Sequence, residues 1–179
     1  MQRQQLVEEI KILLDLVARN TTTLADSVME INVSEYTDSA LFEREKIELF
    51  RNYPQFVGPS CILPEPGDYF AFDDTGIPIL IVRQDDASLK AFVNICSHRG
   101  APLNECTHGK AKKGRMFSCP YHGWSYDLKG TLIGVPFGNE GFDSSDRDAL
   151  GLQTLDVQEK HGMIFVMPNP EMTFNIDEV

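Results

Sequence analysis

Two short segments of the chain contain the residue types that bind metals. They are Cys96–Gly100, which reads CSHRG, and Cys119–Trp124, which reads CPYHGW, and twenty residues separate His98 from Cys119. Each segment supplies one cysteine and one histidine. Two thiolates and two neutral imidazoles on facing turns suit a two-iron, two-sulfide cluster in which the thiolates hold one iron and the imidazoles hold the other. The chemistry of such a cluster is the transfer of single electrons.

A structural zinc site is the alternative for the same side chains, because two cysteines and two histidines are also an ordinary zinc ligand set. Zinc fingers usually pair cysteine with cysteine and histidine with histidine at local spacing. Here each segment contributes one residue of each type, and each contains a glycine. The pattern favours the two-iron cluster, and metal analysis separates the two hypotheses.

The sequence around both segments extends the pattern beyond four ligands. The matching stretches are residues 94–101, 119–126, 128–132 and 135–136. Through them the chain from about residue 41 to 168 resembles the N-terminal Rieske domain of the large subunit of aromatic-ring-hydroxylating oxygenases. The resemblance implies one Rieske-type [2Fe-2S] cluster. It also implies that Cys96 and Cys119 bind one iron and that His98 and His122 bind the other.

The same resemblance suggests roles for three aromatic residues. Tyr126 matches the tyrosine whose hydroxyl lies near the cluster in high-potential respiratory Rieske proteins, whereas Trp124 stands where those proteins have a serine. Ala101 and Tyr121 stand where they have the two cysteines of a disulfide, so that bridge cannot form here. Because hydrogen bonds to the cluster sulfurs tune the potential, we expect a potential in the lower part of the Rieske range of about −150 to +300 mV. The rings of Tyr121 and Trp124 would also shield the cluster from water.

Charge and hydropathy argue against two classes of partner. The 179 residues carry a net charge of -11 with a pI near 4.7, which argues against a nucleic-acid-binding surface. No apolar run approaches the length of a membrane span, and the longest N-terminal one is interrupted by Asp15. The N-terminus also lacks the pattern of a secretory signal. Since Cys61 and Cys106 have no evident partner, we expect reduced thiols and predict a cytoplasmic protein.

The N-terminal part of the sequence predicts helices. Apolar residues at one-face spacing indicate an amphipathic helix over residues 5–18, whose apolar stripe either packs on its own domain or contacts another subunit. A polar linker follows, and then a second helix over residues 39–51, which Tyr53-Pro54 ends. We therefore divide the chain into an N-terminal helix and linker, residues 1–38, and a Rieske [2Fe-2S] domain, residues 39–179.

From Gly58 onward, short apolar stretches alternate with turn residues. Strands are expected over residues 69–72, 77–83, 89–95, 116–118, 123–127 and 163–167 and at Val157, with a hairpin turn at residues 128–131. The predicted fold class is therefore all-β with N-terminal helices. By resemblance it is a Rieske fold, which has a β-sandwich base and a small cluster-binding β subdomain spanning about residues 94–137.

The sequence does not predict an oxygen-activating site. By resemblance, oxygenase large subunits hold a mononuclear iron through two histidines and a carboxylate in a later domain, but after His122 this chain has only His161. We expect an electron-transfer domain that takes electrons from a reductase or ferredoxin and passes them to an oxygenase catalytic domain or subunit. A free-standing Rieske ferredoxin is the alternative, although the N-terminal helices argue against it. A non-redox module with a structural or sensory cluster is a third possibility.

Overall fold

The computed structural model describes the whole chain except residues 1–2, 105–106, 112–114, 138–146 and 148. The chain separates into two compact units, Met1–Asp38 and Ser39–Val179. The first unit contains the helices α1 (Arg3–Ala18) and α2 (Ser34–Thr37). The apolar stripe predicted for the first helix is present on α1, and none of the helix's side chains is buried in this structure. None of the described helices is long and apolar enough to cross a membrane.

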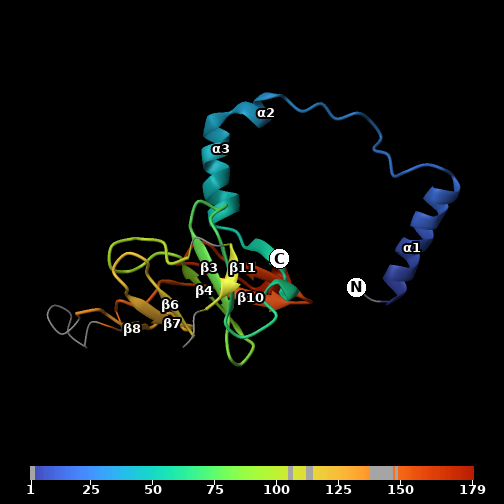
Figure 1. Cartoon of the computed structure of the whole chain (residues 1–179). Helices are drawn as coiled ribbons and strands as arrows, with labels where there is room; N and C mark the ends of the chain where they lie inside the picture. Colours follow the sequence, from blue (N-terminus) through green and yellow to red (C-terminus); the bar gives the residue numbers. More distant parts are fainter. Residues whose placement is uncertain (1–2, 105–106, 112–114, 138–146, 148) are drawn as a thin grey trace. The chain divides into compact units, whose positions relative to one another are not determined.

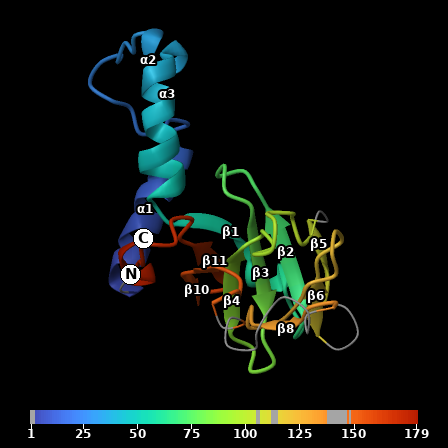
Figure 2. The same cartoon turned by 90° about the vertical axis from the view of Figure 1, so that its left-hand side faces the viewer.

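The second unit begins with a helix that stands off the strands (Figure 1, Figure 2). It consists of α3 (Ser39–Glu45) and a π-helical continuation, η1 (Lys46–Arg51). The predicted helix over residues 39–51 is thus present. It ends at Asn52, two residues before Pro54, because a residue that precedes proline is disfavoured in the helical region.

A five-stranded antiparallel sheet forms the middle layer of the second unit. In spatial order its strands are β5 (His108–Lys110), β2 (Asp68–Phe72), β3 (Ile79–Arg83), β4 (Leu89–Val93) and β9 (Thr154–Leu155). Every residue of β3 is buried, because both faces of the sheet are covered. Leu80 and Val82 face one hydrophobic core, whereas Ile79 and Ile81 face another.

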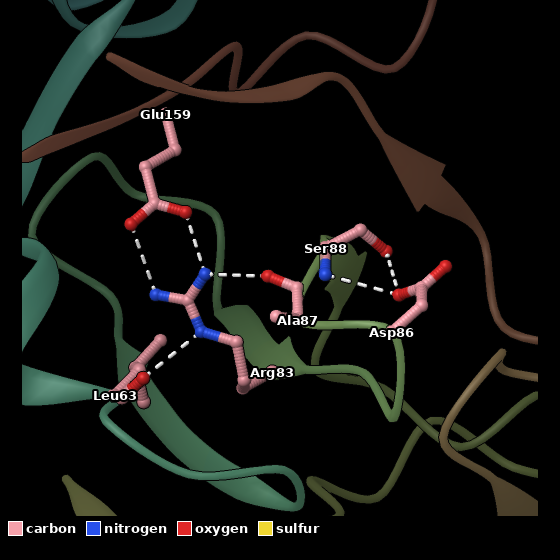
Figure 3. Close-up of polar contacts among 6 residues, drawn as sticks. All are labelled: Leu63, Arg83, Asp86, Ala87, Ser88 and Glu159. Atoms are coloured by element: carbon pink, nitrogen blue, oxygen red, sulfur yellow. Dashed lines mark hydrogen bonds and ion pairs between the residues drawn. The ribbon is translucent and has the colours of Figure 1, made fainter. Parts of the chain in front are cut away.

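A three-stranded sheet covers the Ile79 face. Its strands, in spatial order, are β1 (Gln55–Pro59), β11 (Met163–Val166) and β10 (Val157–Lys160). A charged pair joins the two sheets, because the Arg83 guanidinium donates to both carboxylate oxygens of Glu159, at 2.5 and 3.0 Å (Figure 3). Arg83 also donates to the carbonyl oxygens of Leu63 and Ala87, at 2.9 and 2.8 Å. This buried arginine therefore fixes the end of β3 to its surroundings.

The Leu80 face is covered by the sheet that positions the metal-binding segments. Its strands are β6 (Met116–Ser118), β7 (Ser125–Asp127) and β8 (Leu132–Gly134), in that order. The hairpin turn predicted at residues 128–131 joins β7 to β8. Two short 3₁₀ helices complete the described elements, η2 (Ser60–Ile62) and η5 (Ile176–Glu178). The core on this face includes both segment cysteines, together with Trp124 and Tyr126.

The structure has the all-β architecture with N-terminal helices that the sequence predicts. Strand ends differ by up to two residues; for example, β3 begins at Ile79 rather than residue 77, because Pro78 has no N–H for the ladder. The sequence named no residues for β1, β5, β8 or β9, and for β10 it named only Val157. β5 is three exposed residues and β9 only two residues, so neither carries an apolar alternation that could be recognised.

Candidate metal centre

The first metal-binding segment lies in a loop that leaves the middle sheet at the end of β4. We call residues 94–104 loop 1. The N–H of Cys96 donates to the carbonyl oxygen of Ala101 at 2.8 Å, and the N–H of Gly100 donates back to the Cys96 carbonyl at 3.0 Å. Gly100 has a φ of 75°, a left-handed conformation that glycine adopts without strain. These bonds close a tight turn around His98.

The second segment forms an equivalent turn between β6 and β7. We call residues 119–124 loop 2. The N–H of Cys119 donates to the carbonyl oxygen of Trp124 at 2.7 Å, and the N–H of Gly123 donates to the Cys119 carbonyl at 3.1 Å. Gly123 has a φ of 74°. In both loops the cysteine opens the turn, and a left-handed glycine four residues later closes it.

The two cysteines are brought together in the core. Cys96 is 1% exposed and Cys119 is 4% exposed. Burial raises the pKa of the Cys96 thiol; the Tyr126 hydroxyl opposes the rise, and the adjacent Cys119 thiol adds to it. A buried thiolate pair is therefore unfavourable without a positive partner, which a bound metal supplies.

The two histidines are also brought together, nearer the surface than the cysteines. The ring centroids of His98 and His122 are 4.7 Å apart, at an interplanar angle of 75°. Both Nδ1 atoms are buried, and Nδ1 of His122 has no hydrogen-bond partner among the described residues. Burial lowers the pKa of His98, and the charges of His122 and Arg99 lower it further. The neutral imidazole, which is the form that binds metal, is therefore favoured.

Two aromatic rings lie against the histidines. Trp124, which is buried, stacks on His98 with ring centroids 4.7 Å apart and an interplanar angle of 13°. The ring centroids of Tyr121 and His122 are 3.8 Å apart, although Tyr121 is 63% exposed. Trp124 is thus placed to exclude water from one imidazole, whereas Tyr121 covers the other only in part.

Tyr126 contacts loop 1 from β7. Its hydroxyl oxygen lies 3.3 Å from Cys96 Sγ and accepts a hydrogen bond from the N–H of Ser97 at 3.1 Å. Burial raises the pKa of Tyr126, and the neighbouring Cys96 raises it further. The hydroxyl therefore keeps its proton and can donate it to a Cys96 thiolate.

These side chains fit a two-iron cluster. Two buried thiols lie together, and two imidazoles with buried Nδ1 atoms lie together, which is the division of ligands that such a cluster requires. Within the described part of the chain, no three histidine, cysteine, aspartate or glutamate side chains are placed to hold a single metal ion.

The remaining histidines and cysteines belong to other parts of the structure. His108 lies on β5, where the centroid of its ring is 4.6 Å from that of Phe70. His161 lies between β10 and β11. Cys61 is a free, exposed thiol. Cys106 lies outside the described residues, so the prediction that it is reduced stays a prediction.

The sequence profile of the Rieske [2Fe-2S] domain matches residues 54–155. The chain belongs to this family. Its cofactor is therefore a Rieske-type [2Fe-2S] cluster, and the predicted Rieske fold is confirmed. The match also decides between the iron cluster and the zinc hypothesis that the ligand types alone left open.

Relatives of this Rieske domain confirm the resemblance to oxygenase large subunits. The alpha subunit of benzene 1,2-dioxygenase from Pseudomonas putida is 37% identical over 130 residues, which are 73% of this chain and 28% of that subunit. The oxygenase subunit of glycine betaine monooxygenase from Chromohalobacter salexigens is 37% identical over 131 residues, with the same two coverages. This chain thus spans a little over a quarter of the length of either relative.

Solved structures give the same result. A quaternary ammonium Rieske monooxygenase superimposes with a TM-score of 0.72 at 32% identity, over 83% of this chain and 41% of that one. Naphthalene 1,2-dioxygenase superimposes with a TM-score of 0.68 at 32% identity, over 77% of this chain and 31% of that one. The chain corresponds to the Rieske part of such oxygenases.

Sequence reasoning missed the residues that hold loop 1 in place. The Asn94 side chain bonds to the backbone of Asn104, and Ser97 Oγ donates to the carbonyl oxygen of Gly151 at 2.8 Å. The partner of Ser97 is more than fifty residues away, and the sequence gives no signal for it. The position of Asn94 two residues before the first segment was the available signal.

Proposed function

We propose that this Rieske domain relays single electrons from a reductase or ferredoxin to a mononuclear iron that is held outside these residues. In this proposal, residues 39–179 form the Rieske domain and residues 1–38 form an N-terminal helix and linker. The observation that carries it is the pairing of two buried thiols with two imidazoles on turns of the same construction. When bound, a Rieske cluster accepts and releases one electron at a time.

Cys96 and Cys119 would hold one iron, and His98 and His122 would hold the other. The buried state of both thiols supports the inner position for the cysteine-bound iron. The two histidines are partly exposed, so electrons would enter and leave on their side. Trp124 would keep water from His98, and the Tyr126 hydroxyl would donate a hydrogen bond to the Cys96 sulfur.

The electron acceptor in this proposal is an oxygenase catalytic domain or subunit. The names of the relatives support this choice, since all those described above are dioxygenases or monooxygenases. Their names give chemically different substrates, among them benzene and glycine betaine, so the relatives do not share one substrate class. The proposal includes neither a nucleic-acid partner nor a membrane, and it places the protein in the cytoplasm.

The test is metal analysis and electron paramagnetic resonance (EPR) of the full chain purified without oxygen. We expect two irons per chain, no zinc, and a Rieske signal after reduction. Cys96→Ala and His122→Ala should each abolish the signal, whereas Cys61→Ala should leave it intact, because Cys61 is a free thiol at the surface. A Rieske signal that survives in Cys96→Ala would contradict the ligand assignment.

A second measurement tests the electron relay itself. The reduced chain is mixed with an oxidised oxygenase subunit whose own Rieske cluster has been removed by mutation. One-electron oxidation of this chain with turnover of the oxygenase would support the proposal. Oxidation only by small-molecule acceptors, with no turnover, would contradict it.

A further inference from the structure

The two ends of loop 1, residues 94–95 and 102–104, lie side by side, and we call them its neck. A side chain, rather than a pair of strands, holds this neck closed. β4 ends at Val93, and the chain returns through residues 102–104, which belong to none of the named strands. Asn94, which is 4% exposed, begins the neck, and its N–H donates to the carbonyl oxygen of Pro78 at 2.7 Å. The backbone of Asn94 is therefore fixed to the segment just before β3.

The carboxamide of Asn94 makes two hydrogen bonds to a single residue across the neck. Its Nδ2 donates to the carbonyl oxygen of Asn104 at 2.7 Å, and its Oδ1 accepts from the N–H of Asn104 at 3.2 Å. One donor and one acceptor thus satisfy both backbone groups of Asn104, as a residue of a neighbouring antiparallel strand would. The side chain thus replaces the pair of backbone hydrogen bonds that two strand residues would exchange at this point.

This contact is the outermost of three cross-links that lead toward the ligands. The next is an antiparallel bridge between Ile95 and Pro102. The third is the bond from the N–H of Cys96 to the Ala101 carbonyl, which closes the turn around His98. Because Pro102 has no N–H to donate, Ile95 and Pro102 form a pair of the non-hydrogen-bonded kind, which depends on the backbone bonds beside it, such as the one from Cys96 to Ala101. The Asn94 contact adds two hydrogen bonds to this closure, at the end farthest from the ligands.

The chemistry of the contact is specific to asparagine. Aspartate has the same shape but no N–H, so its carboxylate would face the Asn104 carbonyl oxygen without a donor between them. Alanine would leave both backbone groups of Asn104 without their partners, and buried groups without partners are costly. Loop 2 has no such requirement, because Ser118 and Ser125 at its base are paired in the β6–β7 ladder.

We propose that Asn94 is a positioning residue for the cluster. Its carboxamide holds the neck of loop 1 closed and thereby keeps Cys96 and His98 in the arrangement that binds iron. This inference rests on the ligand assignment proposed above. It adds that the geometry of one ligand pair depends on a side chain that does not touch the cluster.

The test uses the full chain with its cluster and compares Asn94→Ala and Asn94→Asp with two controls. In Asn104→Ala both backbone partners of Asn94 remain, and the side chain that is removed takes no part in the contact. Gln84→Ala removes another buried carboxamide, which donates to the Leu128 carbonyl at 2.7 Å, outside loop 1. It therefore controls for a general loss of stability.

Three readouts separate positioning from stability. Protection of the Asn104 amide against hydrogen exchange should fall about thirtyfold in Asn94→Ala, which loses both hydrogen bonds. It should fall less in Asn94→Asp, whose carboxylate can still accept from the N–H, and the protection factor should stay unchanged in Asn104→Ala. The EPR signal should shift or broaden, and the potential should change, in the Asn94 variants alone. Loss of iron at a fixed temperature should be several-fold faster in them.

Two results would overturn the proposal. One is unchanged Asn104 exchange in both Asn94 variants. The other is a fall in melting temperature equal to that of Gln84→Ala with an unmoved EPR signal and potential, which would make Asn94 a stability residue only. A wild-type chain without any Rieske signal would instead contradict the proposed function, while the exchange result would still report on the Asn94 contact.

Discussion

The two ligand loops share one backbone design but are built into the molecule differently. In each loop the N–H of the cysteine donates a hydrogen bond to the carbonyl oxygen five residues later. The N–H of a glycine with a φ near 75° donates to the carbonyl oxygen of the cysteine. Yet the histidine stands two residues after Cys96 in loop 1 and three residues after Cys119 in loop 2. The shared turn therefore fixes the cysteine and the backbone, and the histidine position within it differs between the loops.

The surroundings of the loops explain how both can be held firmly. Loop 2 connects two paired strands, so the β6–β7 ladder supports it on both sides. Loop 1 is joined to a strand at one end only, and hydrogen bonds from side chains support the rest of it. The Asn94 side chain bonds to the backbone of Asn104. The Tyr126 hydroxyl accepts from the N–H of Ser97, and the Ser97 hydroxyl donates to the carbonyl oxygen of Gly151. Where the backbone ladder ends, hydrogen bonds from side chains take over its role.

The largest expected effect comes from moving the histidine within loop 2. Exchanging Tyr121 and His122, by Tyr121→His together with His122→Tyr, would give loop 2 the spacing of loop 1. Because position 121 is 63% exposed, the imidazole should point to solvent. We expect loss of the cluster, measured as iron per chain and as EPR amplitude.

Tyr121→Phe is the control for this exchange, since it keeps the histidine in place and should retain the cluster. A full complement of iron in the exchanged variant, with two nitrogen ligands detected by pulsed EPR, would show that the spacing of the histidine is not fixed by the turn.

Replacing each of the two turn glycines by alanine should lower the stability of the protein by a different amount in each loop. Either substitution places a side chain in the left-handed region, at a cost of about 1 kcal/mol. At Gly100 the new Cβ meets nothing within 4 Å, whereas at Gly123 it lies 3.0 Å from Cγ of Pro136, whose ring cannot rotate away. We expect a loss of about 1 kcal/mol for Gly100→Ala and about 2–3 kcal/mol for Gly123→Ala in urea unfolding. Equal losses would contradict this difference in packing.

Tyr126→Phe should affect loop 1 and spare loop 2. It removes the hydroxyl that contacts Cys96 Sγ and leaves the Ser97 N–H without its acceptor, so we expect about 1–2 kcal/mol lower stability. The cluster potential should fall, because a hydrogen bond to a ligand sulfur stabilises the reduced state. A potentiometric titration measures this shift, and an unchanged or higher potential would argue against a bond from Tyr126 to the sulfur.

The smallest effect is expected from the Arg83–Glu159 pair, which touches neither loop. The Arg83 guanidinium, through its hydrogen bonds, lowers the pKa of Glu159 below its ordinary value of 4.5. The stability that this shift provides is complete above that ordinary value and is lost as the pH falls through the lowered one. We expect about 1 kcal/mol between wild type and Glu159→Gln at pH 7, and a smaller difference at acid pH.

Urea unfolding at several pH values measures this difference, and the EPR signal at pH 7 should be the same in both proteins. A difference that grows on acidification would contradict the sign of the pKa shift. An altered EPR signal would show that the pair is coupled to the loops after all.

The sequence predicted the parts of the fold in which local chemistry repeats. Alternation of apolar and turn residues predicted β2, β3, β4, β6, β7 and β11 to within two residues at either end. It could not predict β5 or β9, because these short edge strands exist only where an existing strand offers free backbone groups. Nor could it predict that Cys96 and Cys119 share one core with Leu80 and Phe92.

The residue types and their spacing by themselves identified the metal-binding segments of this protein and favoured a two-iron cluster. Thiolates and imidazoles bind metals whatever fold carries them, and the family match decided between the iron cluster and zinc. The tertiary structure alone decided how the ligands are held, because hydrogen bonds such as Ser97 to Gly151, or Gln84 to Leu128, join residues that are distant in sequence. Such contacts depend on how the sheets stack, and no local pattern encodes that stacking.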